Sequence, residues 1–106
     1  MNATFEVFYS DPAREDLIRL FDFLLDRAKV SQDFGSAQAA IDVIRDTVER
    51  SLRRAPFAYR KAGGNPFLRK LLISFGGAGY VALYEIKNAT HVVVLAVRHQ
   101  SDDDYY

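Results

Sequence analysis

The chain has 106 residues, of which 49% are hydrophobic, and this length and composition suit a single domain with one packed core over residues 1–106. The absence of cysteine excludes a disulfide framework and a thiolate metal site, and two histidines are too few to favour a zinc site. The 14 basic and 14 acidic residues cancel to a net charge of zero. Because proteins that bind nucleic acid strongly usually carry a basic excess, we expect no strong direct nucleic-acid binding.

No apolar run approaches the roughly 20 residues that a membrane-spanning helix needs. The first residues, Met-Asn-Ala-Thr-Phe-Glu, lack the basic segment and following apolar segment of a signal peptide. We therefore expect a cytoplasmic protein that makes no contact with a membrane.

The first predicted element is a strand over residues 4–9, in which Phe5, Val7 and Tyr9 face the core. Asp11 is a favourable N-cap and Pro12 suits the first position of a helix, so a helix is expected over residues 12–28. Its apolar residues recur at the spacing of one buried stripe. They are Ala13, Leu17, Leu20, Phe21, Leu24, Leu25 and Ala28.

A turn over residues 30–35 leads to a second amphipathic helix, which starts near Asp33 or Ser36 and ends near Arg54. Ala55-Pro56 ends this helix, because the residue before a proline is disfavoured in the helical conformation. Two consecutive helices joined by a short link form an antiparallel hairpin. The buried stripe of the second helix is Ala37, Ala40, Ile41, Ile44, Val48 and Leu52.

Three strands follow a loop over residues 57–66, and their spacing is typical of an antiparallel meander. The last is apolar from Val92 to Val97 and rich in valine, so we predict that it is the central strand of the sheet and that the first strand pairs with it. The expected fold is α+β, with the order β-α-α-β-β-β and the helical hairpin packed on one face of a mostly antiparallel sheet. The three strands cover residues 67–75, 80–87 and 92–99.

Residues at the joints of these elements form an ordered set that covers nearly the whole chain. They are Tyr9-Ser10-Asp11-Pro12-Ala13, Glu15-Asp16-Leu17 with Phe21 and Phe23, Leu52 with Pro56, Arg69, Tyr80 with Tyr84, and Val94-Leu95-Ala96-Val97-Arg98-His99-Gln100. This set resembles the RelE/ParE family of bacterial toxins from toxin–antitoxin pairs. It looks closest to the ParE branch, where a strand-end His-Gln followed by acidic residues and Tyr is a familiar ending.

The resemblance implies a toxin that is held silent by a cognate antitoxin, ParD-like or similar, whose flexible C-terminal part wraps the toxin in a hetero-oligomer. ParE-type members poison DNA gyrase by binding, which implies no catalytic site, cofactor or metal. RelE-type members enter the ribosome and cut messenger RNA. The resemblance therefore implies two different chemistries for one fold.

A RelE-type nuclease needs a general base, cationic groups at the scissile phosphate and a general acid. The net charge of zero counts against this alternative, as do Asp102-Asp103-Asp104, which would repel a phosphate beside His99. We therefore favour a binding toxin over an enzyme, with an endoribonuclease, or a non-toxic family member that binds an antitoxin, as the alternatives. The resemblance suggests these residues for a nuclease: Arg69, Lys70, Arg98, His99 and Tyr105 or Tyr106.

Residues 50–70 contain seven of the 14 basic residues and no acidic residue. Arg53 and Arg54 are explained equally well by a helix C-terminus, where each basic side chain contributes ~0.3–1 kcal/mol, as by a binding role. Phe21–Leu25 is more apolar than one buried stripe requires, so Phe23 is a candidate for an exposed antitoxin groove, unless the sheet or a loop covers it. The candidate binding residues are Arg53, Arg54, Arg60, Lys61, Arg69, Lys70, Arg98, His99 and Phe23.

His99 allows two interpretations: it is either an ordinary hydrogen-bonded residue at a strand edge or a group that takes part in acid–base chemistry. Tyr80 and Tyr84 share a face of their strand and are expected to be packing residues.

Overall fold

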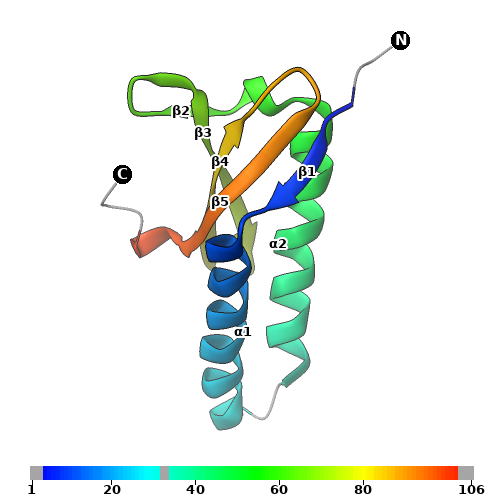
Figure 1. Cartoon of the computed structure of the whole chain (residues 1–106). Coiled ribbons are helices and arrows are strands. Elements are labelled where there is room, and N and C mark those ends of the chain that lie inside the picture. The colour runs from blue at the N-terminus through cyan, green and yellow to red at the C-terminus, as the bar shows by residue number, and fades with distance from the viewer. Residues whose placement is uncertain (1–3, 32–33, 103–106) are drawn as a thin grey trace.

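The computed structural model describes residues 4–31 and 34–102 and has the expected α+β architecture (Figure 1). Two helices separate the first strand from the other four, and all five strands form one sheet. The elements are β1 (Glu6–Tyr9), α1 (Asp11–Ser31), α2 (Phe34–Arg54), the 3-10 helix η1 (Pro56–Ala58), β2 (Arg60–Ala62), β3 (Asn65–Phe75), β4 (Ala78–Ile86), β5 (His91–His99) and the 3-10 helix η2 (Gln100–Asp102).

The sheet has the strand order β1-β5-β4-β3-β2. The first strand pairs with β5, as expected, and this is the one parallel pair among the described strands. However, β5 is an interior strand beside β1, and the middle position belongs to β4. A continuous apolar run therefore identified an interior strand, but it could not distinguish the middle of the sheet from its neighbour.

The expected loop over residues 57–66 instead contains η1 and β2, and β3 begins at Asn65. Arg60 and Lys61 pair with Lys70 and Arg69 across a turn in which Gly63 has a φ of 69°, a conformation that favours glycine. The sequence Arg-Lys-Ala gives no hydrophobic alternation, so pattern analysis has no means of finding this short edge strand.

Both helices are close to their expected bounds, but the N-cap of α1 is Ser10 rather than Asp11. The Ser10 hydroxyl accepts a hydrogen bond from the Ala13 N–H at 3.2 Å, and the Ser10 carbonyl accepts one from the Arg14 N–H. Asp11 is the first residue of the helix, where its charge complements the helix dipole. Of the turn expected over residues 30–35, residues 30–31 belong to α1 and residues 34–35 to α2, and residues 32–33 lie outside the described residues.

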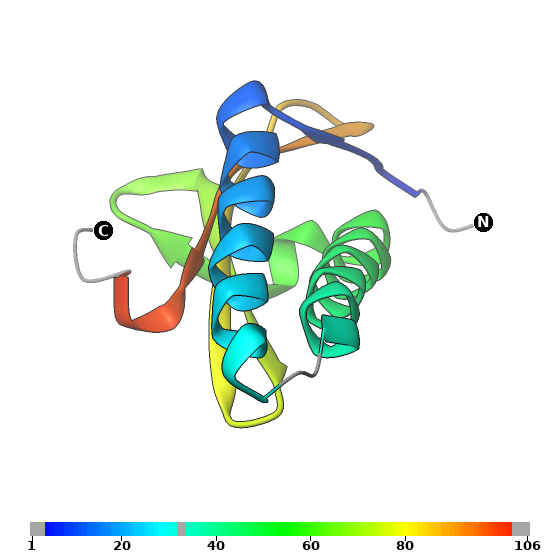
Figure 2. The same cartoon turned by 90° about the horizontal axis from the view of Figure 1, so that it is seen from below.

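The core lies between the helical hairpin and one face of the sheet (Figure 2). All six residues of the stripe predicted for α2 are buried, and Tyr80 and Tyr84 pack against them as expected. Among the described residues no helix covers the other face, on which Phe8 and Leu72 are exposed. A search of the same residues finds no helix with the length and hydropathy to cross a membrane.

Candidate functional site

Two elements form hydrogen bonds to the outer edge of β5: β1 pairs with its first part, and α1 contacts it beyond the end of β1. β1 pairs with His91–Val94, after which the Ser10 hydroxyl donates to the Leu95 carbonyl at 3.3 Å. Further along, Asp16 Oδ2 of α1 accepts a hydrogen bond from the Val97 N–H at 2.9 Å. The first turns of α1 therefore satisfy the edge of β5 that β1 leaves open, and they fix the helix beside the end of this strand.

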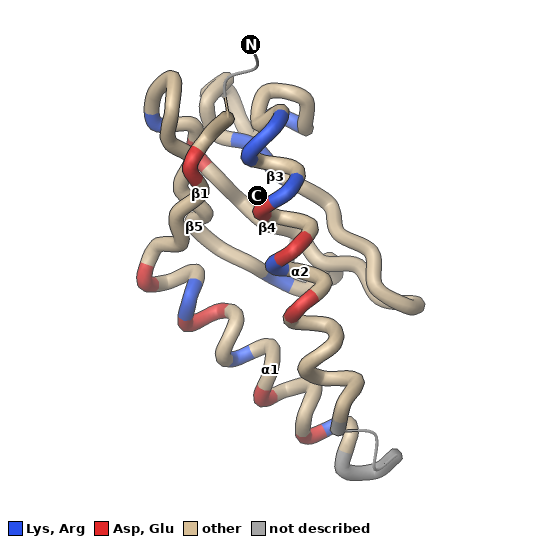
Figure 3. The backbone as a smooth tube through the Cα atoms, turned by 90° about the vertical axis from the view of Figure 1, so that its right-hand side faces the viewer, with Lys and Arg blue, Asp and Glu red and all other residues tan. Residues whose placement is uncertain are grey.

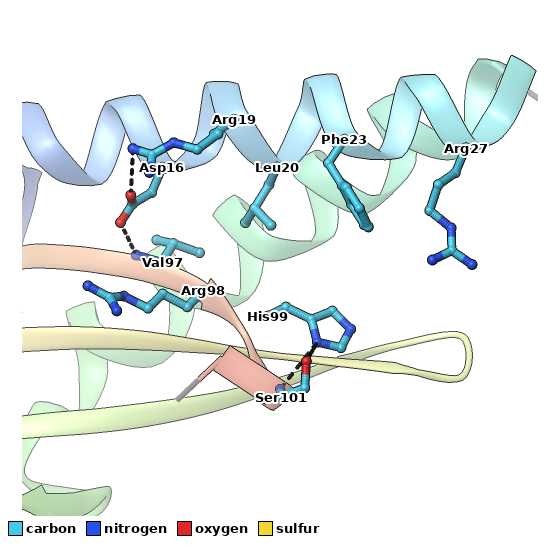
Figure 4. Close-up of a pocket in the computed structure, with 9 residues that line it drawn as sticks. All are labelled: Asp16, Arg19, Leu20, Phe23, Arg27, Val97, Arg98, His99 and Ser101. Carbon is cyan, nitrogen blue, oxygen red and sulfur yellow. Dashed lines mark hydrogen bonds and ion pairs between the residues drawn. The ribbon is translucent and has the colours of Figure 1, made fainter. Parts of the chain in front are cut away.

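Beyond Asp16, α1 and the end of β5 enclose a groove of about 620 Å³ (Figure 4). Phe23 projects into it and is 52% exposed, with the Arg27 guanidinium carbon 5.6 Å from its ring centroid. Phe23 is therefore exposed and is not covered by the sheet or by a loop of the described residues, so it remains a candidate for the antitoxin groove. The groove is lined by Asp16, Arg19, Leu20, Phe23, Arg27, Val97, Arg98, His99 and Ser101.

His99 is held at the end of β5 by its own neighbours. Its Nδ1 lies 2.8 Å from the Ser101 hydroxyl and accepts a hydrogen bond from the Ser101 N–H at 3.2 Å. Its ring packs edge-on against Tyr80, with the centroids 5.6 Å apart. Because Nδ1 is an acceptor for a backbone N–H, the neutral ring that fits this geometry carries its proton on Nε2.

Arg69 lies elsewhere and is nearly buried, with 9% of its surface exposed. Its Nε donates to the Pro66 carbonyl and its Nη1 donates to the carbonyls of Phe57 and Tyr59, each at 2.8 Å. Arg69 pairs with Tyr84 and His99 pairs with Tyr80, so four residues of strand, about 13 Å, separate them along the sheet.

Lys70 faces the opposite side of the sheet from Arg69 and is 8% exposed. Arg98 and His99 both line the groove, but the register places Lys70 on the sheet face of Arg98 and Arg69 on the sheet face of His99, so the four residues do not converge on one point. Tyr105 and Tyr106 lie outside the described residues. Within residues 4–31 and 34–102, no cluster of three His, Asp or Glu side chains could hold a metal ion.

The remaining basic candidates gather at the other end of the molecule. Arg53 and Arg54 form the last turn of α2, and Arg60 and Lys61 lie on β2; all four are exposed. Figure 3 shows this basic end of α2, in contrast with the mixed charges along α1.

Two exposed phenylalanines that sequence analysis did not single out, Phe57 and Phe67, lie beside these cations with their ring centroids 6.2 Å apart. They were missed because they lie at the two ends of a segment that was interpreted as a plain loop.

A second, smaller groove of about 440 Å³ lies between α1 and α2, with Tyr9, Ile18, Phe21 and Arg45 among its lining residues. The Tyr9 hydroxyl is buried, and it has no hydrogen-bond partner among the described residues. Burial, reinforced by the nearby Glu49 carboxylate and opposed by Arg45, raises the pKa of Tyr9 to about 12. The phenol is therefore neutral near pH 7.

Comparisons with known proteins point to one family. The family model described as "ParE toxin of type II toxin-antitoxin system, parDE" matches residues 7–104. "Toxin RelE3" of Caulobacter vibrioides is 34% identical over 87 residues, which cover 82% of this chain and 85% of that protein. A solved structure, "Chromosomal ParDE TA system from P. aeruginosa", superposes with a TM-score of 0.70 over 92% of this chain and 98% of the other. The two sequences are 16% identical, so this likeness shows the common fold alone.

Proposed function

Because the chain belongs to the ParE/RelE family of toxins from type II toxin–antitoxin systems, we propose that it inhibits DNA gyrase by binding it and that a ParD-like antitoxin neutralises it. Membership of this family implies an antitoxin partner. On this proposal the protein acts in the bacterial cytoplasm as a binding toxin, and its action needs no catalytic group, cofactor or metal.

The observation that carries the proposal is the groove between α1 and β5. Phe23 exposes half of its surface there, and Arg19, Arg27 and Arg98 line the same groove. An apolar anchor with Arg27 beside it, in a groove that also presents the Arg19–Asp16 ion pair and Arg98, suits a protein segment that offers an apolar side chain and carboxylates. We assign this groove to the antitoxin, and the exposed basic residues Arg53, Arg54, Arg60 and Lys61 to contact with the target.

The alternative, a ribosome-dependent nuclease, is favoured by one observation, that Arg98 and His99 line the same groove. General acid–base catalysis needs its groups within hydrogen-bond reach of the same reacting atoms. Arg69 is engaged by three backbone carbonyls, and Lys70 lies on the face of the sheet opposite to His99. This separation supports binding over RNA cleavage.

The test is a gyrase supercoiling and DNA-cleavage assay with the purified full chain, run beside a translation reaction in which messenger RNA is monitored for cleavage. Gyrase inhibition with intact RNA is the expected result. Cleavage of RNA on the ribosome with gyrase unaffected would overturn the proposal in favour of the nuclease. No effect in either reaction would also overturn it, and would favour a family member that binds its antitoxin without toxicity.

A further inference from the structure

Exposed aromatic and basic side chains lie at the end of the molecule formed by η1 and the β2–β3 hairpin, where Lys61 pairs with Arg69 and Arg60 pairs with Lys70 on opposite faces of the hairpin (Figure 1). Together they form one surface. We define it as the hairpin-end patch: Phe57, Phe67, Arg54, Arg60 and Lys61. Each phenylalanine is 49% exposed, and the two rings meet edge to face with an interplanar angle of 73°. The three basic side chains are also exposed.

Hydrogen bonds from two buried side chains, Arg69 and Tyr84, fix the backbone that carries the hairpin-end patch. The Arg69 guanidinium donates to the carbonyls of Phe57 and Tyr59 and lies 5.3 Å from the centroid of the Phe57 ring. The buried Tyr84 hydroxyl donates to the Pro56 carbonyl at 2.6 Å. These contacts fix the backbone on both sides of Phe57, so little side-chain or loop order has to be created when a ligand binds.

The charged residues in the sequence around the patch are all basic. The sequence contains no acidic residue between Glu49 and Glu85, although it contains seven basic residues there. The zero net charge of the whole chain therefore hides a local positive field at this end, whereas acidic and basic positions alternate along α1 (Figure 3). Such a field attracts anions over about one Debye length, roughly 8–10 Å at ordinary salt.

From this arrangement we infer that the hairpin-end patch binds single-stranded nucleic acid, with an unpaired base stacked on one of the two exposed phenylalanine rings and flanking phosphates held by Arg54, Arg60 and Lys61. Exposed aromatic rings beside cations are the two parts that single-strand binding requires, because every base offers a flat face and every nucleotide a phosphate. The inference rests on the patch alone and does not depend on gyrase being the target.

An acidic peptide fits the patch less well. An extended peptide would pair with the outer edge of β2, but this strand has only three residues, and its register with β3 shifts between Lys61 and Ala62. Short, irregular, positively charged edges discourage strand addition. An exposed pair of rings, in contrast, offers the flat contact that a base needs.

The patch has no evident means of selecting the sugar. Asn65 Oδ1, the acceptor beside the rings, already accepts a hydrogen bond from the Phe67 N–H at 2.9 Å. The remaining patch side chains meet only bases and phosphates. DNA and RNA strands should therefore bind alike, since a 2′-hydroxyl is the group by which proteins distinguish them.

The test is fluorescence anisotropy of a labelled ten-nucleotide oligo-dT with the full-length protein at low salt, beside oligo-rU, a duplex of the same length and a labelled ten-residue oligo-glutamate. The key variant is Phe57→Leu with Phe67→Leu, which keeps the apolar character but removes both rings. Phe8→Leu is the matched control, because it removes a ring of similar exposure on β1, the edge strand at the other side of the sheet from β2.

We expect the double variant to bind oligo-dT at least about fivefold more weakly and the Phe8 control to bind as the parent protein does. Arg60→Gln with Lys61→Gln should lower the slope of log affinity against log salt by about 1.4, while Arg14→Gln, an exposed residue of α1, should leave it unchanged. Equal binding to oligo-rU and weaker binding to the duplex would support the inference.

Three results would overturn it: no measurable binding, affinity that survives loss of both rings, or oligo-glutamate binding as well as the nucleic acid. A marked preference for oligo-rU over oligo-dT would contradict the sugar indifference and with it the assignment of contacts.

Discussion

At the scale of single residues, charged side chains that lie close together in the sheet differ in burial, and their burial indicates their role. Arg69 and Arg60 lie on paired strands of one hairpin, yet Arg69 is nearly buried against three backbone carbonyls and Arg60 is exposed. A buried guanidinium is stabilising only where its N–H groups are satisfied. The role of Arg69 is therefore to hold the chain around η1.

Arg69→Lys should lower the free energy of unfolding by about 2–3 kcal/mol, because a single ammonium on a longer stem cannot reproduce the fork of bonds to three carbonyls. Arg60→Lys on the neighbouring strand should change it by less than about 0.5 kcal/mol. Urea unfolding measures both. A stable Arg69→Lys variant that had lost toxicity would instead identify Arg69 as a contact residue.

Tyr9 should make stability depend on alkaline pH. Its pKa is about 12 in the folded chain against an ordinary value of ~10, and burial also raises the pKa of Tyr84. A raised tyrosine pKa means that the fold favours the neutral phenol. Its contribution is complete below pH ~10, the unfolded value, and is lost as the pH rises from there through the folded pKa.

Tyr9→Phe should therefore be as stable as the parent protein at pH 8, since the buried hydroxyl has no hydrogen-bond partner among the described residues to lose. It should be more stable than the parent protein at pH 11. Unfolding in urea at both pH values gives the difference. A difference that is the same at pH 8 and pH 11 would show that Tyr9 does not titrate in this range.

At the scale of elements, α1 and η2 position the end of β5 from its two sides. Asp16 completes the strand edge from the helix, and η2 folds back against β4 next to Gly79. Pattern analysis predicted both helices and four of the five strands, because their hydrophobic patterns are clear. It missed β2, because this short strand shows no hydrophobic alternation and pairs with β3 across a tight turn. It assigned the N-cap to Asp11 rather than Ser10, because Asp and Ser are equally good caps.

Asp16→Ala should leave the Val97 N–H without a partner in a nearly buried strand, at a cost of about 1–3 kcal/mol. Hydrogen exchange at the Val97 amide should accelerate, and the amides of Val92–Val94, which β1 covers, should stay protected. Glu15→Ala, the exposed neighbour on α1, is the control and should change neither. Unchanged exchange at Val97 would contradict this role for Asp16.

Gly79 marks a close approach between β4 and η2. A Cβ added to Gly79 would meet Gln100 Oε1 at 2.1 Å, whereas a Cβ on Gly77 would have no heavy atom within 4 Å. Gly79→Ala should therefore displace Gln100 and shift the NMR signals of His99, with a stability loss of about 1 kcal/mol. Gly77→Ala should leave those signals in place, and adding Gln100→Ala to Gly79→Ala should restore them. Persistent shifts in the double variant would place the clash elsewhere.

At the scale of the whole molecule, the chain separates two surfaces of different chemistry. The groove with Phe23 and His99 lies along the last turns of α1, and the hairpin-end patch lies beyond the other end of the helical hairpin (Figure 1). The sequence predicted Phe23 and Arg98 as candidates, and strand alternation places Arg69 and Lys70 on opposite faces, but the sequence could not show that Arg69 is buried against three backbone carbonyls. That outcome depends on strand pairing, which hydrophobic alternation fixes only once the neighbouring strands are known.

The combined change Arg98→Ala and His99→Ala discriminates between a binding toxin and a nuclease. If the groove at the end of β5 holds the antitoxin, the affinity for the antitoxin should weaken by about 1–3 kcal/mol, a factor of roughly 5–150, because removing interface side chains removes only their contacts. Gyrase inhibition should persist. A nuclease would instead lose nearly all turnover with its phosphate clamp or acid–base group. Arg14→Ala, an exposed residue of α1 paired with Asp11 away from the groove, is the control for purification and folding. Complete loss of activity in a folded double variant would move Arg98 and His99 from an interface to a catalytic site.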